Sequence, residues 1–210
     1  KSVKRIILVG LGSEDADTSK LRKAYAALIR QAKAQKAQKL AIWEATDSAL
    51  AAETSVLINY EFTKYKKPSE KPKQELGEVK FFDSKTNTAL KKAVKQANVI
   101  AESTCIARDL VWEPACTVTP TYLAKEAKKI KAKNIKVTVK EAADCKKLGM
   151  GAFLAVAQGA DEPPKFIEIT YTPTGKVKKH IALIGKGVTF DSGGLSLKPS
   201  KAMEMMKEDM

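Results

Sequence analysis

The chain is poor in the residues that build disulfide frameworks and structural zinc sites. Its three cysteines, Cys105, Cys116 and Cys145, are widely spaced and form no Cys-x-x-Cys pair. An odd number without paired spacing argues against both kinds of site and indicates a reducing compartment, so we expect a cytoplasmic location. The single histidine, His180, precedes an apolar segment, and we interpret it as a surface residue at a strand edge.

Long apolar runs are also missing. No stretch approaches the roughly 20 apolar residues of a membrane-spanning helix, so we expect no membrane partner. The first ten residues have a basic start but no adequate apolar core and no cleavage site, which argues against a signal peptide. They resemble a strand already in progress, so we expect the protein to begin before Lys1. The hydrophobic content of 44% and the charged content of 30% are typical of a globular protein.

Acidic residues are too few to balance the basic ones. The chain has 38 Lys and Arg against 24 Asp and Glu, a net charge of +14, which would favour anionic partners. The lysines are spread along the chain, however, and their densest stretches, 64–73 and 125–140, are not interleaved with aromatic residues that could stack on bases. We therefore favour a solvated lysine-rich surface and keep nucleic-acid binding as an alternative.

The pattern of apolar residues alternates between strand and helix, which predicts an α/β fold. We expect strands at 5–9, 40–43, 79–82, 135–139, 152–156, 166–171 and 181–184. We expect helices at 20–36, 48–60, 88–111, 120–133 and 142–148. Residues 64–75, which are rich in Lys, Pro, Ser and Glu, predict an exposed loop.

Capping residues support the expected helix starts. Asp17, Thr18 or Ser19 can cap the first helix, and we assign Ser48 to the second. Pro120 begins a later helix with Thr119 as its cap. The helix at 88–111 is long enough to join two domains, and Glu113-Pro114 ends it because the residue before proline is disfavoured in a helix.

Unusual chemistry is densest in the glycine-rich stretch 185–199, after the last expected strand. A phosphate-binding loop of the Walker type would need Ser or Thr after Lys186, where the chain has Gly187. A second interpretation is a structural turn with a Lys186–Asp191 ion pair. A third is a metal site in which Asp191 and Asp209 are oxygen ligands and Lys186 is an amine ligand, a rare role because the amine must lose its proton. From residue chemistry alone the structural turn is favoured over the metal site.

Several motifs change that balance, because together they resemble one family. They are the stretch from Lys186 to Pro199, the following Met-Lys-Glu-Asp-Met at 206–210, Leu-Gly-Met-Gly at 148–151 with Ala-Val-Ala-Gln-Gly at 155–159, Ala-Arg-Asp-Leu-Val at 107–111, and Glu-Pro-Ala at 113–115. In order and spacing they resemble the leucyl aminopeptidases, or cytosol aminopeptidases, which are two-metal exopeptidases. The similarity continues back to the opening strand and covers essentially the whole chain.

The resemblance implies a role for each of four residues. Lys186 would bind the tightly held metal ion, Asp191 would bridge both ions, and Asp209 would bind the tight-site ion. Lys198 would face the substrate carbonyl as an ammonium and act in catalysis. The family uses two divalent ions, zinc, manganese or magnesium, to remove N-terminal residues, leucine-like ones by preference, from peptides with a free N-terminus, and it assembles as a homo-hexamer.

The resemblance also implies a domain plan. Residues 1–86 would form part of a macro-like α/β N-terminal domain, 87–112 a linker helix, and 113–210 the start of a mixed-sheet α/β catalytic domain. Three departures from the family pattern stand out: Trp112 and Cys116 replace asparagines, Ser200-Lys201 replaces a glycine-containing turn, and the family's later Asp, Glu and Arg lie beyond Met210. We therefore expect the chain alone to be inactive. A DNA-binding protein or a structural homologue without peptidase activity is the alternative.

Overall fold

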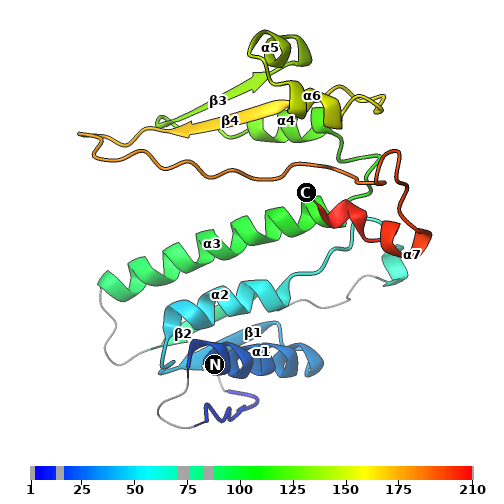
Figure 1. Cartoon of the computed structure of the whole chain (residues 1–210). Helices are drawn as coiled ribbons and strands as arrows, with labels where there is room; N and C mark the ends of the chain where they lie inside the picture. Colours follow the sequence, from blue (N-terminus) through cyan, green and yellow to red (C-terminus); the bar gives the residue numbers. More distant parts are fainter. Residues whose placement is uncertain (1–2, 13–16, 71–75, 83–87, 210) are drawn as a thin grey trace. The chain divides into compact units, whose positions relative to one another are not determined.

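The chain has a mixed α/β fold, as expected, and in the part that the structure describes helices flank two small sheets. The computed structural model describes residues 3–12, 17–70, 76–82 and 88–209, with the backbone alone of Asp209. The chain divides into two compact units, Lys1–Asp109 and Leu110–Met210 (Figure 1). The boundary falls within the long helix, and the three-part domain plan stays a prediction.

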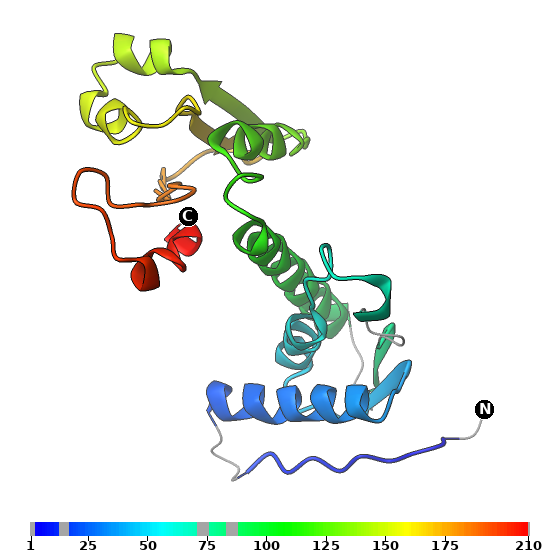
Figure 2. The same cartoon turned by 90° about the vertical axis from the view of Figure 1, so that its right-hand side faces the viewer.

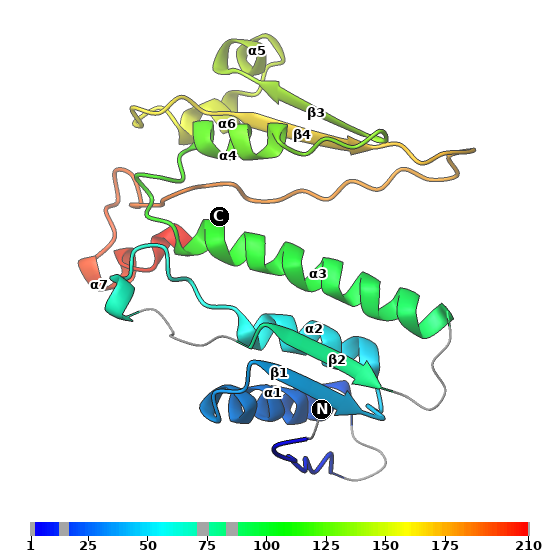
Figure 3. The ribbon, with the colours of Figure 1, turned by 180° about the vertical axis from the view of Figure 1, so that it is seen from behind.

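The first unit packs helices against one face of a two-stranded parallel sheet. Its elements are α1 (Thr18–Ala34), β1 (Lys39–Trp43), α2 (Ser48–Asn59), the short 3-10 helix η1 (Pro68–Glu70), β2 (Glu78–Phe82) and α3 (Thr88–Trp112), which crosses into the second unit. Lys39 lies opposite Glu78, and Trp43 lies opposite Phe82. Figure 3 shows the two strands side by side, with α1 and α2 behind them. The loop expected at 64–75 contains η1, and residues 71–75 lie outside the described part of the chain.

The core of this unit lies between the two helices and the sheet. Tyr25 of α1 packs with Leu50 and Ala51 of α2, and Phe81 of β2 contacts the same cluster. The alternation along a strand explains this contact, because successive side chains point to opposite faces of a sheet. Phe81 therefore faces the helices, whereas Phe82 is exposed on the other face.

Helix α3 is tied to the end of α2 by polar contacts. Arg108 donates a hydrogen bond from Nη1 to the carbonyl oxygen of Leu57 at 2.9 Å, and the Tyr60 hydroxyl donates to Asp109 Oδ1 at 2.8 Å. Burial, together with the hydrogen bond to Asp109, raises the pKa of the Tyr60 phenol to about 12. Figure 2 shows α2 and α3 next to each other.

The helix caps confirm two expectations and correct a third. Asp17 caps α1 through Lys20 N, and Thr119 caps α4 through Tyr122 N, with Pro120 at the helix start. The expectation for α2 was wrong: Asp47 has an extended backbone and accepts a hydrogen bond from Leu50 N at 2.9 Å, so it is the N-cap. Ser48 is the first helical residue, because a cap must lie outside the helix to reach the free N–H groups.

The second unit contains a two-stranded antiparallel sheet and short helices. Its elements after α3 are α4 (Pro120–Lys128), β3 (Ile135–Lys140), α5 (Ala142–Lys147), α6 (Gly151–Val156), β4 (Phe166–Tyr171), α7 (Ser200–Met203) and the 3-10 helix η2 (Met206–Asp209). Ile135 lies opposite Tyr171, and Lys140 lies opposite Phe166. Ala124 and Ala127 of α4 and Cys145 of α5 are buried.

Three expected strands are not observed. Residues 152–156 lie in helix α6, where Phe153 packs edge-on against Phe166 of β4. A short apolar run suits a helix or a strand equally, and Ala and Leu favour the helix. Residues 5–9 and 181–184 have a strand-like composition but no strand partner among the described residues, and a strand needs a neighbour for its backbone hydrogen bonds. Leu8 and Leu183 are accordingly more than 90% exposed.

Two further boundaries bear on the length of the helices. Helix α3 ends at Trp112, one residue beyond the expected end. Helix α4 ends at Lys128 instead of 133, because Lys129 N and Ile130 N bond to the carbonyl oxygens three residues back, which tightens and closes the last turn. Within the described residues, no helix combines the length and apolar character that crossing a membrane requires.

Candidate metal centre

A glycine turn shapes the stretch that carries the candidate ligands. Gly193 has φ +96° and Gly194 has φ +72°, a region that residues with a Cβ rarely adopt. A Cβ at Gly193 would lie 2.3 Å from the carbonyl oxygen of Ser196. The backbone N–H of Lys198 donates to Ser192 O at 2.9 Å and closes the loop. The chain therefore turns back on itself directly after Asp191.

This turn brings Asp191 and Lys198 together, although seven residues separate them. Lys198 Nζ lies 2.9 Å from Asp191 Oδ2, and Gly193 N donates to Asp191 Oδ1 at 2.9 Å. The pair is partly buried, with side-chain exposures of 29% for Lys198 and 36% for Asp191. Both oxygens of the Asp191 carboxylate are thus engaged, one by a backbone dipole and one by a cation.

Met206 adds a second contact to Lys198. The Lys198 ammonium donates to Met206 Sδ, which connects the loop to the first residue of η2. The sequence showed a methionine-rich pattern at this place, but only the path of the loop brings the thioether to the lysine. A thioether is a weak acceptor, so Asp191 is the stronger of the two partners.

The other two candidate ligands are less fully defined. Lys186 lies in an exposed position five residues before Asp191. Asp209 is the last residue of η2, and its side chain lies outside the described part of the structure. The structure thus brings one candidate ligand, Asp191, next to the candidate catalytic residue, Lys198.

The donor set has the chemistry of a site for hard divalent cations. Carboxylate oxygens are the ligands that magnesium and manganese prefer, and zinc also accepts them together with nitrogen. The Lys198 ammonium lies 2.9 Å from Asp191 Oδ2, so the carboxylate is already oriented toward a cation. Among the described side chains no three His, Cys, Asp or Glu residues gather as a metal site. Lysine is not one of these four residue types, and the side chain of Asp209 lies outside the described part of the structure.

A contact that the sequence did not reveal anchors η2 to the end of α3. Lys207 Nζ donates to Trp112 O at 3.3 Å and lies 5.4 Å from the centre of the Trp112 ring. A cation over the face of an indole is attracted by the ring electrons. Sequence patterns marked Trp112 only as a departure from the family pattern, and its partner is 95 residues away in the chain. The contact holds the short helix that carries Asp209.

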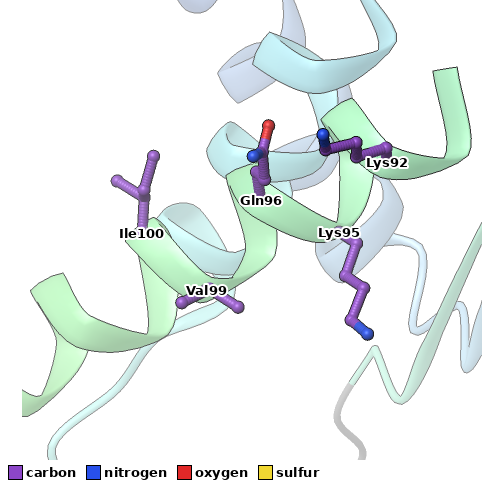
Figure 4. Close-up of a pocket in the computed structure, with 5 residues that line it drawn as sticks. All are labelled: Lys92, Lys95, Gln96, Val99 and Ile100. Atoms are coloured by element: carbon purple, nitrogen blue, oxygen red, sulfur yellow. The ribbon is translucent and has the colours of Figure 1, made fainter. Parts of the chain in front are cut away.

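A separate open pocket lies along α3 in the first unit. It has a volume of about 680 Å³ and is lined by Lys92, Lys95, Gln96, Val99 and Ile100. All five side chains project from the same helix (Figure 4). The lining offers two ammonium groups, one amide and two aliphatic side chains, without a carboxylate or thiol.

Comparison with known proteins covers almost the whole chain. Residues 1–69 match the N-terminal domain of the cytosol aminopeptidase family, and residues 105–210 match its catalytic domain. A probable cytosol aminopeptidase of Nostoc punctiforme is 43% identical over all of this chain and 44% of its own length. One of Gloeobacter violaceus is 54% identical over 56% of this chain and 24% of its own length.

A solved structure shows the same likeness. The bottromycin maturation enzyme BotP in complex with Mn is similar with a TM-score of 0.80 and 36% identity, over 96% of this chain and 43% of that one. The chain therefore spans somewhat less than half the length of the relatives that match it throughout. The domain matches and the identity to the Nostoc punctiforme relative show that this chain belongs to the cytosol aminopeptidase family.

Proposed function

We propose that the protein carrying this chain is a metal-dependent aminopeptidase that releases N-terminal residues, preferably leucine-like ones, from peptides. Family membership and the names of its relatives support the reaction class. The observation that carries the proposal within the structure is the contact of Asp191 with Lys198, because it joins a carboxylate suited to a cation with an ammonium suited to a developing oxyanion.

Lys186, Asp191 and Asp209 are the residues that would hold the metal, with Asp191 shared between two ions. The similar BotP structure is a complex with Mn, which supports a hard divalent ion, and zinc or magnesium fits the same donors. Bound divalent ions would supply Lewis-acid activation of a water molecule near neutral pH. Asp191 is suited to the shared position because its two oxygens are held in a fixed orientation by Gly193 N and the turn.

Lys198 would act on the substrate. Its ammonium lies beside Asp191, the proposed metal ligand. It can therefore reach the carbonyl oxygen of a peptide that is bound at the metal centre. Negative charge develops on this oxygen as the carbonyl carbon is attacked, and an ammonium aimed at it stabilises the transition state more than the ground state. Loss of Lys198 should therefore reduce kcat more than it alters KM.

The test compares three variants of the complete protein. Asp191→Asn should lose both metal and turnover of a leucine amide. Lys198→Met should keep its metal and lose roughly a hundred- to a thousandfold in kcat. Lys201→Met, which removes an exposed lysine of α7, is the matched control and should behave as wild type. Unchanged metal content in Asp191→Asn, or unchanged kcat in Lys198→Met, would refute the respective role.

Cytoplasmic location and hexameric assembly complete the proposal. The family name supports the first, and the resemblance alone supports the second. Sedimentation analysis of the complete protein would test the assembly, with a hexamer as the expected species and a monomer as the contrary result.

A further inference from the structure

The Asp191–Lys198 ion pair places a positive charge at one oxygen of the proposed metal ligand. Lys198 Nζ is 2.9 Å from Asp191 Oδ2, and a divalent ion binds a carboxylate oxygen at roughly 2.0–2.6 Å. If both occupied Oδ2, the two cations would lie within roughly 5 Å of each other. Like charges at that distance in a partly buried site repel strongly.

We propose that Lys198 and a divalent cation compete for Asp191. The Asp191–Lys198 ion pair forms in the absence of metal, and metal binding displaces the Lys198 ammonium from it. The inference rests on the proposed role of Asp191 as a metal ligand. Displacement would release the ammonium from Asp191 and make it available to the substrate carbonyl. Metal binding and the availability of the Lys198 ammonium to the substrate would then be coupled through a single carboxylate oxygen.

The surroundings of Lys198 allow this exchange. Its backbone is fixed by the hydrogen bond from Lys198 N to Ser192 O, so the loop can keep its path while the side chain turns. The ammonium sits on a flexible four-carbon stem, and its remaining partner in the structure, Met206 Sδ, is a weak acceptor. At 29% exposure the side chain also has solvent beside it. Leaving Asp191 therefore requires a rotamer change and no refolding.

Competition predicts the sign of a mutational effect. Lys198→Met removes the competing charge while keeping an unbranched side chain of similar length. Mn²⁺ no longer has to displace a partly exposed ion pair, and the repulsion between the two cations is gone. Together these effects should strengthen Mn²⁺ binding by about two- to tenfold. If Lys198 instead served to hold Asp191 in place for the metal, the same change would weaken binding.

Calorimetric titration of the metal-depleted complete protein with Mn²⁺ alone measures this effect. The dissociation constant should fall in Lys198→Met and stay unchanged in Lys201→Met, which removes the same charge from an exposed position. An unchanged or higher dissociation constant in Lys198→Met overturns the competition. Asp191→Asn separates the competition from the proposed role of Asp191 as a metal ligand. If this variant binds Mn²⁺ as well as wild type, Asp191 is not a ligand, and the competition is wrong for that reason.

A second measurement needs no substitution at Lys198. Pulsed acylation of lysine amines, with mass-spectrometric mapping, reports how accessible each amine is. Labelling of Lys198 should rise on adding Mn²⁺ while labelling of Lys201 stays constant. In Asp191→Asn, Lys198 should label strongly even without Mn²⁺. Labelling of Lys198 that is constant or falls on adding Mn²⁺ to wild-type protein contradicts the displacement.

Discussion

Gly193 and Gly194 are adjacent and both have positive φ, yet a side chain would meet different surroundings at each. A Cβ at Gly193 would lie 2.3 Å from Ser196 O and 3.1 Å from Lys198 N, whereas at Gly194 nothing lies within 4 Å. Backbone atoms cannot move aside as a flexible side chain can. Gly193 is therefore required for the loop path itself, and Gly194 for its local conformation alone.

Alanine substitution should separate these two requirements. Gly194→Ala should cost roughly 1–2 kcal/mol of loop stability from the positive φ and leave Mn²⁺ affinity nearly intact. Gly193→Ala should in addition push the chain away from Ser196 and break the hydrogen bond from Gly193 N to Asp191, so Mn²⁺ affinity should fall by roughly tenfold or more. Titration calorimetry on both variants provides the comparison, and equal affinities would contradict this role of Gly193.

Sequence patterns indicated which residues of the loop carry chemistry but not how they meet. The structure gives Asp191 an ion pair with Lys198, seven residues away, a partner that no sequence pattern indicated. The pair with Lys186 that the structural turn implied stays a prediction. The contact with Lys198 depends on the positive φ at Gly193, which a sequence permits but does not dictate. The contact of Lys207 with Trp112 was equally hidden, because no local pattern connects residues 95 positions apart.

Helices were predicted better than strands in this chain, and the cause is physical. A helix satisfies its backbone hydrogen bonds within one segment, so the spacing of Tyr25, Leu28 and Ile29 suffices to predict α1. A strand depends on a partner elsewhere. Residues 40–43 and 79–82 pair with each other and are strands, whereas 181–184, which is just as apolar, has no such partner among the described residues.

The cap of α2 provides a test at the scale of one element. Asp47→Ala should lower the free energy of unfolding by about 1 kcal/mol, because the N–H of Leu50 loses its acceptor next to the core residues Leu50 and Ala51. Asp47→Asn keeps a side-chain oxygen and should retain most of the stability. Urea denaturation followed by circular dichroism measures both. If Asp47→Ala lowers the free energy of unfolding less than Ser48→Ala does, Ser48 and not Asp47 is the N-cap of α2.

At the scale of the molecule, the chain corresponds to somewhat less than half of its full-length relatives. The similarity covers all of this chain and 44% of the Nostoc punctiforme protein. Three candidate ligands, Lys186, Asp191 and Asp209, are present in this chain. The family resemblance implies a larger ligand set than these three residues.

The 210-residue chain alone should therefore show no aminopeptidase activity. The expected result is no release of leucine from a leucine amide with added Mn²⁺ or Zn²⁺, under conditions where the complete protein is active. Circular dichroism of the isolated chain is the control that it has folded. Robust turnover by the folded chain alone would show that the site needs no further ligands.

The pairing of the strands also has a consequence for the order of folding. Neither sheet is a hairpin: Lys39 pairs with Glu78 across α2, and Ile135 pairs with Tyr171 across α5 and α6. Closing the long loop between two paired strands costs conformational entropy, which the hydrogen bonds between the strands offset only once the pair has formed. The helices, in contrast, form from neighbouring residues. Both sheets should consequently form late, after α2, α5 and α6 have shortened the loops. During that interval the strands stay unpaired and their apolar side chains stay exposed, and this is the stage at which the chain is most open to aggregation.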